Sequence, residues 1–156
     1  MQYIECPEYY KGRWPASRND KLLFLAGGIT SCPDWQQDYR KLLENEPNLI
    51  LLNPRRKNFD VRDPNASDFQ ITWEHENLEG SDMVSFWFPE ETLCPITLFE
   101  LGKISAKQSK PIFVGTHPNY KRKFDVIKQL QLIRPSITVV HSLENLADQI
   151  IKYLRR

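Results

Sequence analysis

With 156 residues, 40% of them hydrophobic and 26% charged, the chain has the size and composition of one globular domain with a single core. Its net charge of +1 gives no reason to expect nucleic acid or an acidic membrane surface as a partner. No apolar run approaches the ~20 residues that a membrane span needs, and the N-terminus lacks the layout of a signal peptide.

The first twenty residues carry Pro7, Gly12 and Pro15 among polar and aromatic residues, so we expect an irregular arm or a hairpin that lies on the domain. Residues 21–156 are expected to form the domain itself. Within it, residues 22–26 are a short apolar run, which is typical of a central parallel strand.

A helix is predicted next, because Asp34 can cap it and apolar residues recur on one side up to Pro47. Residues 49–52 predict a second strand that stops at Asn53. Residues 54–68 form a long polar loop with four basic residues and two prolines, and a loop of this length in a small domain is usually functional or disordered.

The third strand is predicted at residues 83–88, after a helix over 69–78. A turn-rich loop, 89–95, separates this strand from a helix that begins at residue 96. Further elements are expected in this order: a strand at 112–114, a helix at 121–133, a strand at 137–140 and a helix at 143–154.

Strand and helix alternate five times, which predicts a single-domain α/β fold, flavodoxin-like or Rossmann-like. We expect a parallel five-stranded sheet in the order 2-1-3-4-5 with helices on both faces. Ligands bind such sheets where the strand order reverses, here between strands one and three. That point brings Gly27 and Gly28 beside the loop over 89–95.

Gly27 and Gly28 let a ligand approach the backbone, or they simply form a tight turn. The chain has neither a GxGxxG fingerprint nor a P-loop. Arg55 and Arg56 follow the second strand, where they could hold a phosphate or only solvate a loop.

Glu100 is expected in the first turns of a helix that follows a strand end. An acidic residue there can complement the helix dipole, or it can act as a nucleophile toward an anomeric carbon. Glu74 lies on the preceding helix, where carboxylates most often face solvent. The three cysteines, Cys6, Cys32 and Cys94, have no metal-ligand spacing, so we expect free thiols, no metal and a cytoplasmic location.

Five segments together resemble the nucleoside 2-deoxyribosyltransferase family, and in particular its divergent 2-deoxyribosyltransferase-like branch. They are FLAGGI (24–29), LNPRR (52–56), WEHENL (73–78), FWFPEET (86–92) and PITLFELG (95–102). The resemblance covers roughly residues 21–133. It implies an enzyme without a cofactor that breaks the N-glycosidic bond of a nucleoside and transfers the sugar to another base or to water.

The resemblance also implies roles for single residues. Glu100 matches the family's nucleophile, and Glu74 stands where the family has an aspartate that handles the proton of the departing base. Cys94 stands at the offset of the family's sugar-binding aspartate. This departure points to a changed substrate, to a nucleoside phosphate held by Arg55 or Arg56, or to a site that binds without turnover.

The expected substrate-binding residues are Gly27, Gly28, Asn53, Arg55, Arg56, Trp73, Phe88, Glu91, Thr92 and Cys94. Trp35, Trp73 or Trp87 could stack on the base. The family builds its pocket partly from a neighbouring subunit, so a homo-oligomer is expected, with the aromatic residues 9–14 as one possible cover. Two rival functions stay open: an NAD glycohydrolase-like enzyme and a nucleotide-binding sensor without turnover.

Overall fold

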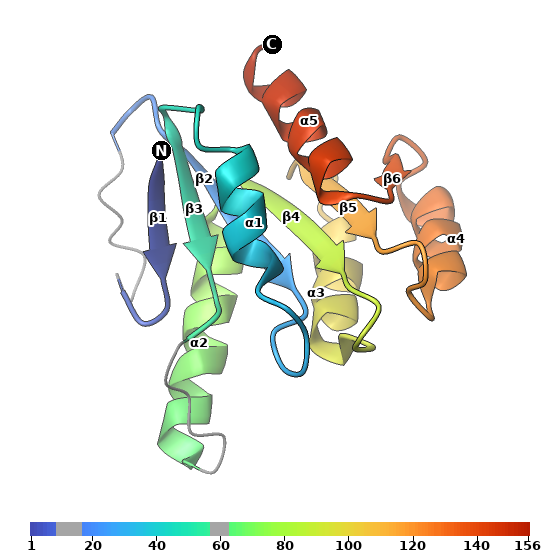
Figure 1. The fold of residues 1–156 in the computed structure, drawn as a ribbon, viewed down its shortest axis with the longest axis horizontal. Helices are drawn as coiled ribbons and strands as arrows, with labels where there is room; N and C mark the ends of the chain where they lie inside the picture. The colour runs from blue at the N-terminus through green and yellow to red at the C-terminus, as the bar shows by residue number, and fades with distance from the viewer. Residues whose placement is uncertain (9–16, 57–62) are drawn as a thin grey trace.

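A computed structural model of the protein describes residues 1–8, 17–56 and 63–156. In these residues a parallel sheet with the strand order β1-β3-β2-β4-β5-β6 lies between two layers of helices (Figure 1). The strands are β1 (Gln2–Glu5), β2 (Lys21–Gly27), β3 (Leu49–Asn53), β4 (Met83–Phe88), β5 (Ile112–Thr116) and β6 (Val139–Val140). The helices are α1 (Trp35–Leu42), α2 (Pro64–Gly80), α3 (Pro95–Ser105), α4 (Lys123–Ile133) and α5 (Leu143–Leu154).

The parallel α/β fold is confirmed, but the predicted count of five strands and the order 2-1-3-4-5 are wrong for the sheet as a whole. A sixth strand, β1, lies at one edge and pairs with β3, so that Gln2 lies opposite Ile50. The backbone N–H of Cys6 continues the pairing by donating to the Asn53 carbonyl at 3.0 Å. This strand was not predicted from the sequence, because it is short and only Ile4 of its four side chains is buried.

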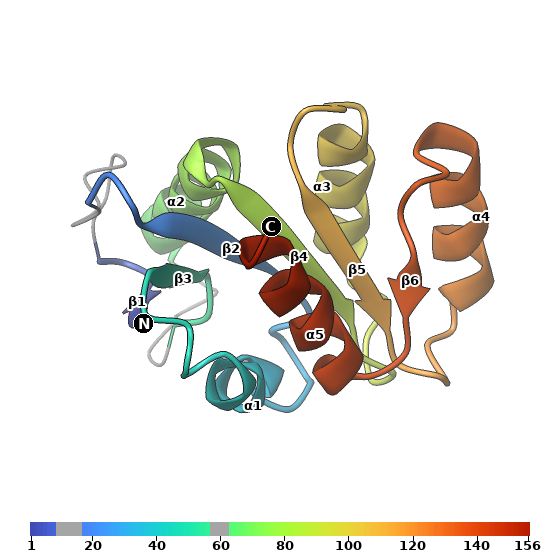
Figure 2. The same ribbon diagram turned by 90° about the horizontal axis from the view of Figure 1, so that it is seen from above.

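The core forms two separate clusters, one on each face of the sheet, because successive side chains of a strand point to opposite faces. Phe24 and Phe86 lie in the cluster under α2, α3 and α4. Leu23 and Leu25 lie in the cluster under α1 and α5. Figure 2 shows α2, α3 and α4 on one side of the sheet and α1 and α5 on the other.

The second helix begins earlier than predicted, at Pro64. The Asp63 side chain accepts a hydrogen bond from the backbone N–H of Asn65 at 2.9 Å, and Pro64 takes the first helical position, where its missing N–H costs nothing. The loop expected over 54–68 is therefore shorter, and residues 57–62 of it lie outside the described residues.

The ends of β2 and β4 adjoin, because Gly27 pairs with Trp87 in the register of these two strands. Asp82 helps to fix this register, since its carboxylate accepts a hydrogen bond from the Leu22 backbone N–H at 2.8 Å. Gly27 and Gly28 therefore lie beside the loop over 89–95, as the sequence predicted. Among the described residues, none of the helices is long and apolar enough to cross a membrane.

Candidate active site

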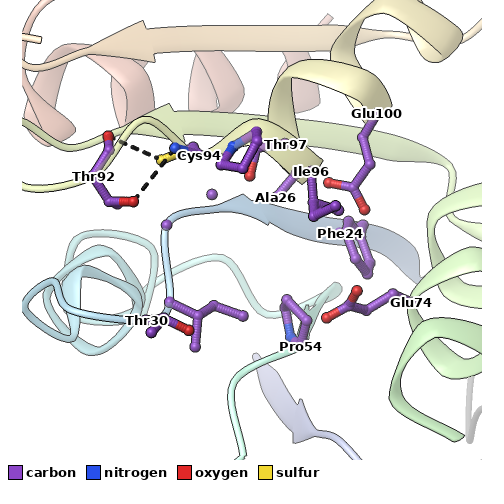
Figure 3. Close-up of a pocket in the computed structure, with 14 residues that line it drawn as sticks. Phe24, Ala26, Thr30, Pro54, Glu74, Thr92, Cys94, Ile96, Thr97 and Glu100 are labelled. Carbon is purple, nitrogen blue, oxygen red and sulfur yellow. Dashed lines mark hydrogen bonds between the residues drawn. The ribbon is translucent and has the colours of Figure 1, made fainter. Parts of the chain in front are cut away.

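A cavity of about 320 Å³ opens at the carboxyl ends of β2 and β4 (Figure 3). Helices α2 and α3 form its walls, and the turn after β2 forms its floor. Its lining residues are Phe24, Ala26, Gly27, Gly28, Ile29, Thr30, Pro54, Glu74, Thr92, Cys94, Pro95, Ile96, Thr97 and Glu100. Six of the twelve residues predicted for the site therefore line one cavity: Glu74, Glu100, Gly27, Gly28, Thr92 and Cys94.

Glu100 enters the cavity from the second turn of α3. Burial raises the pKa of its carboxyl group, and the negative charge of Glu74 raises this pKa further. The positive charge of Lys103 lowers it in part, and the resulting pKa of Glu100 is about 8. A carboxyl group with this pKa is mostly protonated at neutral pH. A cavity that shifts a carboxyl pKa this far is a candidate for acid–base or nucleophilic chemistry.

Glu74 enters the same cavity from α2. Burial raises the pKa of its carboxyl group, and a hydrogen bond from Gln70 Nε2 to Glu74 Oε1, at 2.7 Å, lowers it. Figure 3 shows the side chains of Glu74 and Glu100 extending from opposite walls toward Phe24. The site thus has two carboxyl groups in different surroundings, which is the condition for one to act as an acid and the other as a nucleophile.

The polar end of the cavity lies at the start of α3. Cys94 has a left-handed backbone with φ 49°, and this turn allows the helix to begin at Pro95. Cys94 is also tied to Thr92, because its Sγ donates to the Thr92 carbonyl at 3.6 Å. Burial raises the pKa of the Cys94 thiol to about 12, so Cys94 is a neutral thiol and not a nucleophile.

The loop between β4 and α3 is held in place by Tyr120. Its hydroxyl donates to the Leu93 carbonyl at 2.8 Å, and its ring lies 5.2 Å from that of Phe88 between centroids. Phe88 is fully buried in this contact and is not among the residues that line the cavity.

Gly27 and Gly28 line the cavity, but the surrounding protein already occupies the space next to them. A Cβ at Gly27 would lie 2.5 Å from Trp35 Cζ2 and 2.6 Å from the Trp87 carbonyl oxygen. A Cβ at Gly28 would lie 2.8 Å from Pro89 Cγ. The close packing of the turn therefore disfavours a side chain at both positions, and more strongly at Gly27, where a backbone oxygen occupies the space.

Arg55 does not reach the cavity. Its guanidinium group donates to Gln36 Oε1 and to the Pro33 carbonyl, each at 3.0 Å, and pairs with Asp34 at 3.3 Å. Asp34 occupies the N-cap position of α1, as predicted, but because its carboxylate pairs with Arg55 its side chain makes no capping hydrogen bond.

Three other predicted residues also lie outside the cavity lining. Arg56 lies over the ring of Phe69, with 5.8 Å from its guanidinium carbon to the ring centre. Asn53 donates to the Tyr3 hydroxyl at 2.7 Å. Glu91 is exposed on the loop before α3.

The tryptophans proposed for base stacking are core residues. Trp73 is fully buried, and its indole N–H donates to the Glu8 carbonyl at 2.8 Å. The indole N–H of Trp35 donates to the Gly28 carbonyl at 2.9 Å. Trp87 packs in the core on the α1 and α5 side. The one aromatic ring among the described residues that does line the cavity is Phe24, in the strand β2.

Several residues that line the cavity were not predicted from the sequence, among them Phe24, Pro54, Ile96 and Thr97. Ile96 and Thr97 lie in the first turn of the helix that carries Glu100, so their distance from Glu100 in the sequence could have indicated them. Phe24 could not be found in this way, since its position in an apolar strand is typical of an ordinary core residue.

Among the described residues, no group of three or more His, Cys, Asp or Glu side chains could hold a metal ion.

The parallel α/β fold, with a cavity at the carboxyl ends of its strands and two half-buried carboxyl groups in that cavity, has the arrangement in which α/β proteins commonly bind small molecules. The chain belongs to the nucleoside 2-deoxyribosyltransferase-like family, whose model matches residues 20–120. None of the curated proteins matches the chain.

The fold is similar to the crystal structure of a conserved protein from Enterococcus faecalis V583, with a TM-score of 0.60 and 18% sequence identity. The alignment covers 86% of this chain and 99% of that chain. At this identity the similarity concerns the fold alone.

Proposed function

We propose that the protein cleaves the N-glycosidic bond of a nucleoside through a covalent intermediate between Glu100 and the sugar, and transfers the sugar to another base or to water. The observation that supports this proposal is the meeting of Glu100 and Glu74 at one cavity, with both carboxyl pKa values raised by burial. Membership of the family agrees with a deoxyribosyltransferase-like enzyme.

In the first step the Glu100 carboxylate forms a bond to C1′ of the sugar, and the bond from C1′ to the base nitrogen breaks. The electron pair of that bond goes to the base nitrogen, which takes the proton of Glu74. In the second step an acceptor base or water attacks C1′ and displaces Glu100. The Glu74 carboxylate then takes a proton from the attacking group, which restores both residues.

The sugar hydroxyls are proposed to lie against Thr92, Cys94 and Thr97 at the start of α3, because these residues line the cavity near Glu100. Hydroxyl and thiol groups replace a carboxylate there, so the sugar is held by neutral hydrogen bonds. This arrangement favours weaker sugar binding than a charged acceptor would give, since hydrogen bonds to charged groups are stronger.

A free nucleoside is the better candidate substrate than its 5′-monophosphate. The donors of Arg55 are directed to Gln36, Asp34 and the Pro33 carbonyl, not to the cavity. A phosphate near Glu74 and Glu100 would also add negative charge to a site that already holds two carboxyl groups.

A second candidate function is a nucleoside sensor that binds without turnover. The observation that favours it is the pKa of about 8 for Glu100, because a protonated carboxyl group is not a nucleophile at neutral pH. The two functions differ in one measurable product, the free base.

The test is incubation of the protein with deoxynucleosides, ribonucleosides, their 5′-monophosphates and NAD, followed by chromatography for free base. Base release from a nucleoside that depends on Glu100 supports the proposed enzyme. Binding detected by calorimetry without base release at any pH from 6 to 9 supports the sensor, and release of nicotinamide from NAD alone supports an NAD glycohydrolase.

We also propose that the protein is cytoplasmic, because its three cysteines are free thiols, as is usual in a reducing compartment.

We further propose that the protein forms a homo-oligomer. Leu93, Ile96 and Phe99 are exposed by 48%, 64% and 73%, and Ile96 is also part of the cavity wall. A neighbouring subunit on this apolar patch would cover the cavity entrance. Sedimentation velocity should show an oligomer that Phe99→Glu dissociates, and a monomeric parent at micromolar concentration would contradict this proposal. The aromatic residues 9–14 lie outside the described residues.

A further inference from the structure

Gln70 on α2 connects the candidate acid Glu74 to two other parts of the fold. Its amide nitrogen Nε2 donates to Glu74 Oε1 and to the Pro54 carbonyl, each at 2.7 Å. Its amide oxygen Oε1 accepts a hydrogen bond from Cys6 Sγ at 3.2 Å. Gln70 itself is not among the residues that line the cavity, so it acts on the site only through Glu74.

The orientation of the Gln70 amide is set by its partners. The Pro54 backbone carbonyl can only accept a hydrogen bond, so the nitrogen of the amide must face it. Burial raises the pKa of the Cys6 thiol to about 12, so this thiol keeps its proton and can donate to the amide oxygen. The Pro54 contact requires the orientation that directs the nitrogen and not the oxygen toward Glu74, and the Cys6 contact agrees with it.

The second hydrogen of Gln70 Nε2 is left for Glu74 Oε1, because the first is used by the Pro54 carbonyl. A group that offers only N–H can hydrogen-bond an unprotonated oxygen and not an O–H. Oε1 therefore stays an acceptor in both charge states of Glu74.

From this geometry, and resting on the proposed function, we infer that Gln70 is a positioning residue that keeps the acid proton of Glu74 on Oε2. Oε2 is the oxygen not bound to Gln70, and it is the one through which Glu74 can serve a departing base in the cavity. The edge strand β1 takes part in this device, because Cys6 directly follows it and fixes the amide oxygen.

Other titratable and charged groups surround Gln70 and Glu74. Glu100 approaches from α3, with Lys103 acting on it, and Cys6 follows β1, with Arg56 acting on it from the end of β3. The substitution Gln70→Met removes the amide oxygen and the amide nitrogen without changing any charge or the length of the side chain. A change in the titration of Glu74 would therefore come from the lost hydrogen bond.

The test is a titration of the Glu74 carboxyl carbon by NMR, on protein with ¹³C-labelled glutamate and with the signal assigned through Glu74→Gln. In Gln70→Met we expect Glu74 to titrate about one pH unit higher than in the parent, because the charged form loses its donor. The infrared C=O stretch of protonated Glu74 should also move to higher frequency, since its carbonyl oxygen no longer accepts a hydrogen bond.

The matched control is Thr72→Val, which removes a hydrogen bond of the same helix, from Thr72 Oγ1 to the Asp68 carbonyl at 2.9 Å, without touching Glu74. This variant should titrate as the parent does. If Gln70→Met does not fold, Gln70→Asn takes its place, because the shorter amide cannot reach both Pro54 and Glu74. An unchanged titration and an unchanged C=O stretch in the folded variant would overturn the inference.

These readouts need no turnover, so they separate the inference from the proposed function. A shifted titration in a protein that never releases base would leave the role of Gln70 intact and refute the enzyme. Base release that depends on Glu100, together with an unshifted titration, would support the enzyme and refute the role of Gln70.

Discussion

The carboxyl groups of Glu100 on α3 and Glu74 on α2 face one cavity, and the charge of Glu74 adds to burial in raising the pKa of Glu100 to about 8. In the resting protein Glu100 therefore holds a proton up to about pH 8. The proposed first step needs the opposite arrangement, with Glu74 protonated and Glu100 charged, and this form also contains one proton.

The pH dependence of the rate should therefore depend on the leaving group. With a natural base, activity should fall above pH ~8, where the pair loses its last proton. With an activated base that leaves as an anion, only the Glu100 carboxylate is needed, so the rate should rise through the same pH. Steady-state kcat/KM for both substrates from pH 5 to 10 checks this prediction.

Glu74→Gln should separate the two substrates further. We expect roughly a 100-fold loss with the natural base, since general acid catalysis typically contributes 10²- to 10⁴-fold, and a much smaller loss with the activated base. Equal losses with both substrates would mean that Glu74 does not donate the proton.

The stability of the protein should fall between about pH 4.5 and pH 8 because of Glu100. The folded state holds the Glu100 proton in this range, whereas the unfolded state releases it near the ordinary value of 4.5. The stabilising effect of this proton is complete at low pH and is lost as the pH rises through the folded pKa. Glu100→Gln lacks this loss, so relative to the parent it should gain on the order of 4 kcal/mol in unfolding free energy between pH 5 and 9. Urea denaturation at both pH values measures the gain, and parallel pH dependence in the two proteins would contradict the assigned pKa.

The two glycines after β2 should respond unequally to alanine. Gly27→Ala places a Cβ 2.6 Å from the Trp87 backbone oxygen, which cannot move aside, so we expect a loss of about 2–3 kcal/mol. Gly28→Ala meets the tips of the Pro89 and Thr92 side chains at 2.8 and 2.9 Å and should cost less. Gly102→Ala is the control, because no atom lies within 4 Å of the added Cβ, and it should stabilise the helix by up to about 1 kcal/mol. Thermal denaturation of the three variants gives the order, and an equal cost at all three sites would contradict it.

Arg55→Ala should lower stability and leave substrate preference unchanged. The lost contacts to Gln36 and the Pro33 carbonyl predict about 1–3 kcal/mol of destabilisation. Arg122→Ala is the control, since its ion pair with Asp125 is exposed and should contribute less than about 1 kcal/mol. A ten-fold advantage of a 5′-monophosphate over its nucleoside in the parent, lost in Arg55→Ala, would show instead that Arg55 binds phosphate.

Hydrophobic patterning predicted most of the fold. The strand Met83–Phe88 and the helix Leu143–Leu154 have the predicted bounds, because a continuous apolar run and a strongly amphipathic stretch leave little ambiguity. The edge strand Gln2–Glu5 was missed, since an edge strand needs few buried residues and its neighbours include proline. Its pairing with β3 is a long-range contact that local sequence does not reveal.

The candidate site was only partly predictable, for a related reason. Glu100 and Glu74 were found from motifs, and the order of strands brought them to one cavity. The basic residue Arg55 and the tryptophan Trp73 were assigned by residue type, which does not tell whether a side chain faces a ligand or its own protein. Gln70 was not found, because its role depends on Cys6 and Pro54, which are distant in the sequence.

The most direct test of the account is intact-protein mass spectrometry after rapid quenching with a nucleoside and no acceptor base. We expect an adduct with the mass of the sugar, located by peptide mapping at Glu100, in the parent and in Glu74→Gln with an activated base. The adduct should be absent in Glu100→Gln, whereas the exposed-site control Glu44→Gln should form it as the parent does. Base release at the parent rate by Glu100→Gln, or an adduct on another residue, would contradict the central claim that Glu100 is the nucleophile.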